Sequence, residues 1–243
     1  MVSWKTVLMG LLVILLVNCA KDINEPVGED IAGEGIKIMP LGASRVEGDP
    51  PDFFSYRYEL WKLLIDQDVA FDLVGSQEDE YDYNSYAGQN FDGDHEGHSG
   101  AIAAEILNII ESRQNDLAKV DITLISSPAG NDALSGGSLP TAVSHIKSMV
   151  DLLLQSNPNM MVIIEKMAPG HSDIWNQDLA DRLTFLHEQM GLLVDSYSSD
   201  NIILIDMATG FSDDYLSDEV HYNEAGAKFI ANRYYDLLQK LIE

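Results

Sequence analysis

The chain has few basic residues and almost no cysteine. It contains 14 lysines and arginines against 40 aspartates and glutamates, so its formal net charge is −26 over 243 residues. A surface of that charge repels phosphate backbones and anionic lipid, so we expect no nucleic-acid partner and no polybasic membrane contact. Cys19 is the single cysteine, and a chain with one cysteine forms no internal disulfide.

No apolar run near the N-terminus is long enough to span a bilayer comfortably. Lys5 precedes a short apolar stretch at 7–17, a pattern typical of a signal peptide. The Leu-Val-Asn-Cys ending at 16–19 resembles a bacterial lipobox, whose cysteine is lipidated. We therefore expect a lipoprotein-type signal peptide over 1–18, a lipid anchor on Cys19 and a polar tether over 19–34. This predicts an exported protein held at the cell envelope, in the periplasm or on the outer surface, or otherwise secreted.

Apolar, β-branched runs alternate with amphipathic stretches in the rest of the chain, which predicts a parallel sheet with helical crossovers. The expected strands are buried on both faces and lie at 36–39, 70–74, 120–125, 160–164 and 201–205. The expected helices lie at 53–67, 100–113, 141–155, 179–197 and 224–242. We predict one three-layer α/β/α domain over 35–243 around a five-stranded parallel sheet, with a long irregular loop over 76–96.

Residue types that hydrolysis needs stand at three separate places. Ser44 ends a Gly-Ala-Ser triplet after the first expected strand, Asn131 follows the third, and Asp218 and His221 precede the last helix. A serine nucleophile needs a base within hydrogen-bond reach, and the base needs an acidic partner. All these residues, with Gly100, are expected at the carboxyl edge of the sheet, where open α/β folds bind ligands. The pattern predicts a serine hydrolase.

The motifs resemble those of the SGNH, or GDSL-type, hydrolases, and most of all carbohydrate esterase family three, whose characterised members deacetylate xylan and related sugars. The segments that carry the resemblance are IMPLGAS at 38–44, DHEGHSG at 94–100, GND at 130–132 and DEVHYNEAG at 218–226. The resemblance implies a flavodoxin-like SGNH fold with Ser44 as nucleophile, His221 as general base and Asp218 as its orienting acid. It also implies an oxyanion hole made by the backbone N–H groups of Ser44 and Gly100 and the side-chain amide of Asn131. This chemistry needs no cofactor and no metal.

Each of these residues also has an ordinary structural use. A serine like Ser44 commonly caps a helix, a glycine like Gly100 starts one, and an asparagine like Asn131 occurs in turns. His221 and Asp218 are also compatible with solvated loop positions. The combination favours the catalytic interpretation.

Three positions depart from the resemblance. Ala43 replaces the aspartate of Gly-Asp-Ser, Ala129 replaces the glycine of Gly-x-Asn, and Tyr222 stands where proline is common after the histidine. We expect these changes to affect the rate and the shape of the acyl pocket more than the chemistry.

The segment 92–97 reads like the first half of an EF-hand loop, but Ala103 stands where that loop needs a glutamate. We reject such a calcium loop and keep open a looser cation site on Asp92 and Asp94. His95 and His98 lack the spacing of a zinc-protease helix, so a metal site there is the minority alternative.

Ser99 is expected to cap a helix, because the chain has no Gly-x-Ser-x-Gly elbow that would make it a nucleophile. The aromatic residues Trp175, Tyr81, Tyr83 and Tyr86 are candidates for stacking on a sugar ring, with packing at a helix start or a place on a mobile loop as the alternative.

The sequence therefore predicts a serine carboxylic ester hydrolase that removes short acyl groups, with acetyl expected, from a saccharide through an acyl-enzyme. Its expected partner is a small acyl ester or an acetylated saccharide, and it meets a membrane only through a lipid on Cys19. A lysophospholipase- or thioesterase-type lipolytic enzyme remains open. So does a non-catalytic surface binding protein on the same fold, which Ala43 and Ala129 motivate.

Overall fold

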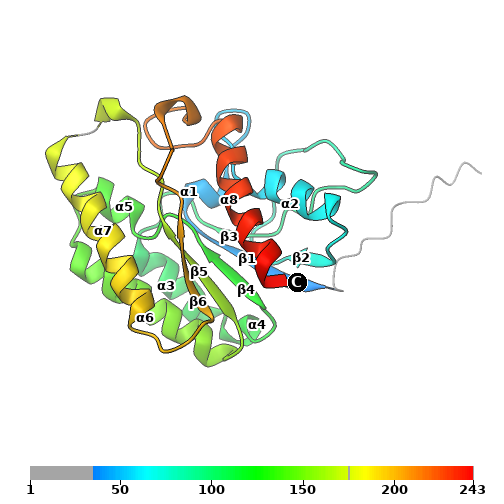
Figure 1. The fold of residues 1–243 in the computed structure, drawn as a ribbon, viewed down its shortest axis with the longest axis horizontal. Coiled ribbons are helices and arrows are strands. Elements are labelled where there is room, and N and C mark those ends of the chain that lie inside the picture. The colour runs from blue at the N-terminus through cyan, green and yellow to red at the C-terminus, as the bar shows by residue number, and fades with distance from the viewer. Residues whose placement is uncertain (1–34, 175, 243) are drawn as a thin grey trace, which may run out of the picture.

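The computed structural model describes residues 35–174 and 176–242. The predicted signal peptide, Cys19, the tether and Trp175 lie outside these ranges. A parallel sheet of order β2-β1-β4-β5-β6 forms the middle of the molecule, and β3 pairs with β1 beyond the end of β2 (Figure 1). Its strands are β1 (Ile36–Gly42), β2 (Phe71–Leu73), β3 (Glu96–Gly97), β4 (Ile122–Ile125), β5 (Met161–Lys166) and β6 (Ile202–Asp206).

Helices cover both faces of this sheet (Figure 1). One face packs against α2 (Arg57–Asp66) and α8 (Glu224–Ile242), and the other against α3 (Ala103–Ser112), α6 (Leu139–Ser156) and α7 (Gln177–Asp195). Shorter helices occur in the connections: α1 (Ser44–Glu47), α4 (Gln114–Leu117), α5 (Gly130–Leu134), η1 (Ser172–Ile174) and η2 (Asp213–Tyr215). The predicted three-layer α/β/α architecture is confirmed.

Alternation of side chains along the strands divides the core into two. On β5, Val162 and Ile164 join the cluster under α3, α6 and α7, whereas Ile163 between them joins the cluster under α2 and α8. All three are fully buried. A strand buried on both faces has no polar side to alternate with, which is why it reads as a continuous apolar run.

The expected strands are all present, and two details of the sheet were not predicted. β1 continues to Gly42, so it leads directly to Ser44. β3 is only two residues long and carries no apolar run. Because β2 pairs with residues 36–38 and β3 with Leu41 and Gly42, Pro40 falls in the gap between them, where a missing N–H leaves no partner unsatisfied.

Two helices begin later than expected, and the prediction that Ser99 caps a helix is wrong. Helix α2 begins at Arg57 rather than 53, and α3 begins at Ala103 rather than 100. Gly100 has a φ of +78°, which is not helical, so the helix cannot include it. Ile102 occupies the N-cap position of α3, and the N–H of Ser99 donates instead to the Glu47 carboxylate.

The irregular segment 76–95 is tied to the body of the molecule by a buried arginine. Arg57 is 1% exposed and donates to the carbonyls of Val46, Glu47 and Gly93. It also forms an ion pair of 2.7 Å with Asp79. The loop therefore has a fixed path beside α1, the helix that Ser44 opens.

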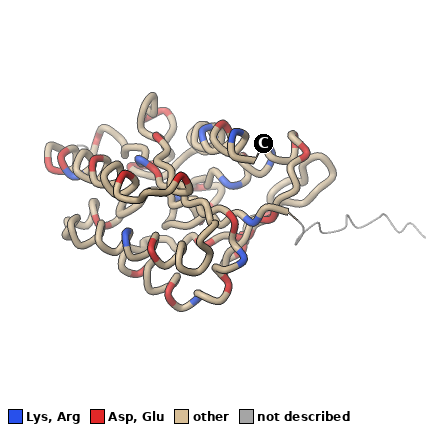
Figure 2. Tube along the Cα trace, turned by 60° about the horizontal axis from the view of Figure 1, so that its bottom comes forward, with Lys and Arg blue, Asp and Glu red and all other residues tan. Residues whose placement is uncertain are grey.

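Acidic residues are spread over most of the elements, with fewer basic residues between them (Figure 2). Among the residues that the structure describes, no helix combines the length and the apolar character needed to cross a membrane.

Candidate active site

Ser44, His221 and Asp218 form a continuous chain of hydrogen bonds at the carboxyl edge of the sheet. The Oγ of Ser44 lies 2.9 Å from Nε2 of His221, and Nδ1 of His221 lies 2.7 Å from Oδ2 of Asp218. Ser44 opens α1 directly after β1, and the other two side chains come from the loop before α8. This is the geometry of a nucleophile, its general base and the acid that orients the base.

Asp218 is held by the backbone as well as by the imidazole. Its Oδ1 accepts hydrogen bonds from the N–H groups of Val220 and His221, at 2.8 and 2.7 Å. Partial burial raises the pKa of the Asp218 carboxyl. These bonds and the one from the His221 ring lower the pKa by more than burial raises it, so the pKa lies below its ordinary value. Asp218 therefore stays ionised and fixes the tautomer of His221.

Phe53 covers the imidazole and was not predicted as a site residue. Its ring stacks on His221 at a centroid distance of 4.0 Å and an interplanar angle of 19°. The N–H of Phe54 donates to the carbonyl of Tyr222 at 2.8 Å, which ties the Phe53 segment to the histidine loop. Nothing in the sequence near Phe53 indicates a partner so far along the chain.

Three N–H donors line one hollow beside Ser44. The Nδ2 of Asn131 donates one hydrogen to the carbonyl of Ala101 at 2.9 Å, so its amide is oriented and its second N–H is free to face a ligand. In the described part of the chain, the backbone N–H groups of Ser44 and Gly100 donate to no protein atom. A Cβ on Gly100 would meet no heavy atom within 4 Å, because this position faces the open hollow. The structure brings together every residue predicted for the oxyanion hole.

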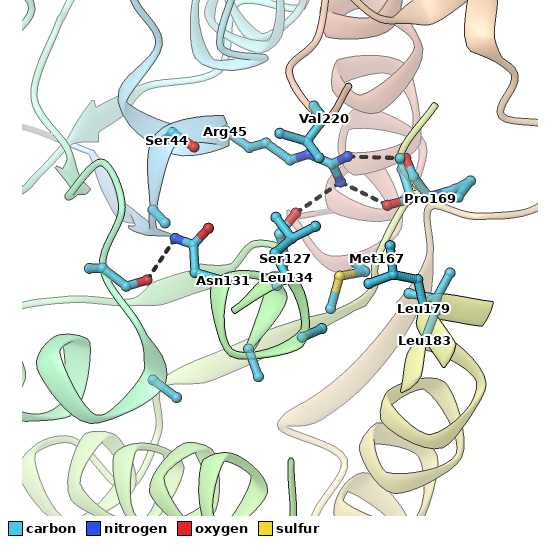
Figure 3. Close-up of a pocket in the computed structure, with 18 of the residues that line it drawn as sticks. Ser44, Arg45, Ser127, Asn131, Leu134, Met167, Pro169, Leu179, Leu183 and Val220 are labelled. Carbon is cyan, nitrogen blue, oxygen red and sulfur yellow. Dashed lines mark hydrogen bonds between the residues drawn. The ribbon is translucent and has the colours of Figure 1, made fainter. Parts of the chain in front are cut away.

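Arg45 links the nucleophile turn to two other loops and was not predicted as a site residue. It is 8% exposed, and its guanidinium donates to the carbonyls of Val220 and Ala168 at 2.7 Å and of Pro169 at 3.1 Å (Figure 3). The guanidinium also lies over the ring of Tyr222, 4.6 Å from its centroid. One buried side chain thus holds the serine turn against the loop that carries His221.

A buried carboxylate, that of Glu165, connects the chain segments that lie next to Arg45 and Asn131. Glu165, at 0% exposure, accepts hydrogen bonds from the Oγ of Ser126, the N–H of Ser127 and the hydroxyl of Tyr234. Burial raises the pKa of Glu165, and these hydrogen bonds oppose the rise only in part. The network joins the end of β4, which precedes the Asn131 helix, to α8.

Two hollows of different character meet at Ser44 and Asn131. The first, called here the apolar cavity, is walled mostly by carbon and extends from Ser44 to Leu179 and Leu183 (Figure 3). The second, called here the polar hollow, is lined by His221, Gly100 and a set of acids: Glu47, Asp49, Glu78, Asp79 and Glu80. The volume open to the centre of a water molecule is about 80 Å³ in the apolar cavity and about 820 Å³ in the polar hollow.

Three of the four residues considered for metal binding have other side-chain partners, and Asp94 is the exception. Burial, with the positive charge of Arg57 nearby, lowers the pKa of His95 to about 3, and its Nδ1 accepts the N–H of Gly97. His98 pairs with Glu96 at 2.8 Å. The Asp92 carboxylate accepts the N–H of Leu73 at 2.7 Å. Within 35–174 and 176–242, no three histidine, cysteine or acidic side chains are placed to hold a metal ion.

The three tyrosines of the 76–96 segment have different surroundings. Tyr81 lines the polar hollow and is 43% exposed. Tyr83 stacks on Tyr58 at 4.5 Å, and the hydroxyl of Tyr86 donates to Asp66 at 2.8 Å. Of the three, Tyr81 is the one in a position to meet a ligand in the hollow.

The chain is similar in structure to family 3 carbohydrate esterases. The enzyme from Talaromyces cellulolyticus matches with a TM-score of 0.72 and 26% identity over 85% of this chain and 98% of that chain. An acetyl esterase, solved as a serine-to-alanine mutant with an acetate ion, matches with a TM-score of 0.70 and 25% identity over 85% and 98%. The family 3 enzyme from Clostridium thermocellum matches with a TM-score of 0.67 and 26% identity over 86% and 99%.

A wider set of solved structures shares the fold. A member of the lipolytic G-D-S-L family from Veillonella parvula matches with a TM-score of 0.57 and 19% identity over 84% of this chain and 99% of that chain. No protein-family model matches the chain, and no curated protein matches it in sequence. The structural neighbours are thus family 3 carbohydrate esterases and GDSL-type hydrolases, and the predicted SGNH hydrolase fold is confirmed.

Proposed function

We propose that the protein is a serine esterase that removes a short acyl group from an acylated saccharide through an acyl-enzyme. The observation that carries the proposal is the hydrogen-bonded chain from Ser44 through His221 to Asp218, next to a hollow lined by three N–H donors. The similarity to family 3 carbohydrate esterases supports a saccharide ester, and the acetyl esterase among these structures supports acetyl as a group that the site accepts.

The reaction begins with attack on the ester carbonyl. The Oγ of Ser44 bonds to the carbonyl carbon while Nε2 of His221 takes the serine proton. Negative charge develops on the carbonyl oxygen, where the N–H groups of Ser44 and Gly100 and the amide of Asn131 stabilise it. Loss of one such donor lowers kcat by roughly 10²–10³ in other hydrolases.

The second half returns the enzyme to its starting state. When the C–O bond to the alcohol breaks, His221 gives its proton to the leaving oxygen, and the acyl group stays on Ser44. Water then attacks the acyl-enzyme with His221 as base, and the carboxylic acid leaves. Asp218 remains ionised throughout and stabilises the imidazolium.

Hydrolysis of 4-nitrophenyl acetate by wild type, Ser44→Ala and His221→Ala tests the proposal. We expect kcat of both variants to be at least about 10³-fold lower than that of wild type, because the triad acts as a unit. An acetylated xylo-oligosaccharide is the second substrate, with acetate release as the readout. Wild type no faster than Ser44→Ala on every ester would refute the esterase.

Two alternatives are separated by related measurements. The apolar cavity favours a lipolytic or thioesterase activity as the second candidate, and acyl-thioesters and lysophospholipids test it directly. A non-catalytic binding protein would not be labelled by a serine-reactive phosphonate. We expect such a probe to label wild type and not Ser44→Ala.

We also propose that the protein is exported and anchored through a lipid on Cys19. The support is the charged and apolar leader with its lipobox-like ending. Membrane fractionation of wild type and Cys19→Ala tests this, and we expect the variant to leave the membrane fraction. Equal distribution of the two would contradict the anchor.

A further inference from the structure

The apolar cavity begins at the nucleophile and extends away from it. Its wall includes the small residues Ala43, next to Ser44 in the chain, Ala101 and Ala129. Farther away it is lined by larger apolar side chains, including Met167, Leu179 and Leu183 (Figure 3). A group bound to Ser44 Oγ therefore has an apolar path leading away from the reacting carbon.

The general base determines which part of an ester enters which hollow. His221 has to deliver its proton to the leaving alcohol oxygen, so the alcohol must lie beside His221. His221 lines the polar hollow and is absent from the wall of the apolar cavity. The alcohol therefore occupies the polar hollow, and the acyl chain is left with the apolar cavity.

We propose that the apolar cavity binds the acyl group of the substrate and that it accepts unbranched alkyl chains longer than acetyl, such as butyryl and hexanoyl. This inference rests on the proposed function, because it requires an acyl group on Ser44. An acetyl methyl reaches only the alanine-lined entrance, whereas a longer chain also contacts Met167 and the leucines of α7.

Apart from the oxyanion donors of Ser44 and Asn131, the polar groups at the cavity wall are already engaged, which favours a plain alkyl chain. The guanidinium of Arg45 donates to the carbonyls of Val220, Ala168 and Pro169, and the N–H of Ser127 donates to Glu165. A hydroxyl or carboxylate on the acyl chain would lose its water in the cavity without gaining these partners.

Two departures from the superfamily motifs lie in this wall. Ala43 stands in place of an aspartate and Ala129 in place of a glycine, and both line the cavity. A carboxylate at position 43 would put a charge against an apolar chain. The alanines leave carbon surface at the end of the cavity nearest the nucleophile, which gives them a role in acyl selection.

The test is kcat/KM for 4-nitrophenyl acetate, butyrate and hexanoate with three variants. Ala133→Leu narrows the cavity and Leu183→Ala enlarges it, since both residues line it. Leu192→Ala is the matched control, because Leu192 lies on the same helix, is 61% exposed and lines neither hollow.

We expect kcat/KM in wild type to rise from acetate to hexanoate, by up to roughly fourfold for each methylene that becomes buried. Ala133→Leu should lower the ratio of hexanoate to acetate about tenfold, Leu183→Ala should move the optimum to a longer chain, and Leu192→Ala should leave the ratio unchanged. The inference would be overturned if acetate were the best substrate of wild type. It would also be overturned if each variant changed kcat/KM for all three esters by one common factor. Neither result would touch the proposed esterase, which fails only if Ser44→Ala matches wild type.

Discussion

Residues around the candidate site hold backbone conformations that side chains disfavour. Ala129, the N-cap of the helix that carries Asn131, has a φ of +59°, and Ser127 just before it has a φ of +48°. In this region the Cβ of an L-residue crowds the following carbonyl oxygen, at a cost of about 1–2 kcal/mol. Ala129, which stands where the SGNH motif has glycine, therefore stores strain next to Asn131, the candidate oxyanion donor.

Ala129→Gly should stabilise the protein. Relief of the backbone strain outweighs the extra freedom of glycine in the unfolded chain, so we expect the free energy of unfolding to rise by roughly 0.5 kcal/mol. Urea unfolding measures this. Ala118→Gly is the control, because Ala118 is exposed with an ordinary φ of −60°, and there we expect a loss of roughly 0.5–1 kcal/mol. Equal losses at both positions would contradict the account of strain.

At the scale of the elements, the site depends on loops that single side chains hold together. The Arg45 guanidinium joins α1 to the loop after β5 and to the His221 loop. A buried arginine with several carbonyl acceptors fixes the relative position of these loops, because each acceptor would otherwise be left without a donor.

Arg45→Met should lower both stability and kcat. Three carbonyls lose their donors, so we expect a loss of about 3 kcal/mol in the free energy of unfolding. The His221 loop also loses its tie to the Ser44 turn, so kcat should fall at least tenfold with little change in KM. Arg45→Lys keeps the charge and three N–H donors but lacks the planar fork that reaches three carbonyls together, so it should recover only part of kcat.

The matched control for Arg45 is Arg233→Met. Arg233 also donates to two backbone carbonyls, those of Asp206 and Thr209, but lines neither hollow. It should reduce stability and leave kcat near wild type. If both variants reduce kcat equally, Arg45 has no special part in positioning the triad.

Asp92 makes the attachment of its loop to β2 dependent on pH. Burial raises the pKa of its carboxyl to about 6, although the N–H of Leu73 donates to it. A carboxyl with a raised pKa in the folded state favours folding when protonated. That contribution is complete below its ordinary pKa of 3.8 and is lost as the pH rises through 6.

Asp92→Asn should therefore be more stable than wild type at neutral pH. Asparagine keeps an acceptor for the N–H of Leu73 without the charge, and we expect a gain of roughly 2 kcal/mol above pH 7 that vanishes near pH 4. Urea unfolding across this range, with the exposed Asp200→Asn as control, measures it. A gain that is the same at every pH would show that ionisation of Asp92 is not the cause.

At the scale of the whole molecule, acidic residues are spread over the chain, and a group of them also lines the hollow where the alcohol is expected to bind. Five acids line the polar hollow, and none of its described lining residues is lysine or arginine. A negative potential in a cleft repels anions over about one Debye length, which is ~10 Å at 0.1 M salt.

Esters of anionic sugars should therefore be poorer substrates than esters of neutral ones. We expect kcat/KM for an acetylated uronic acid to rise with sodium chloride between about 0.02 and 0.5 M, because salt screens the repulsion. The control is the acetylated neutral sugar, which should show little salt dependence. The same salt response for both substrates would remove the electrostatic explanation.

The sequence alone determined the layers of the fold and pointed to Ser44, His221 and Asp218, which the structure brings together. Strand β5 is buried on both faces, so its first four residues, 161–164, form an apolar run that can be recognised in the sequence. Ser44, Asp218 and His221 could be found because one follows a strand and two share a loop, and parallel strands bring such positions to one edge.

Only the tertiary structure decided how the triad is supported and what surrounds it. Phe53 stacks on His221, Arg45 reaches Val220, and Arg57 ties down the loop at Asp79, all across long stretches of chain. Local composition does not specify such pairs, because packing selects them after the elements have met. The same holds for the two hollows beside Ser44, whose shapes depend on side chains contributed by several separate loops.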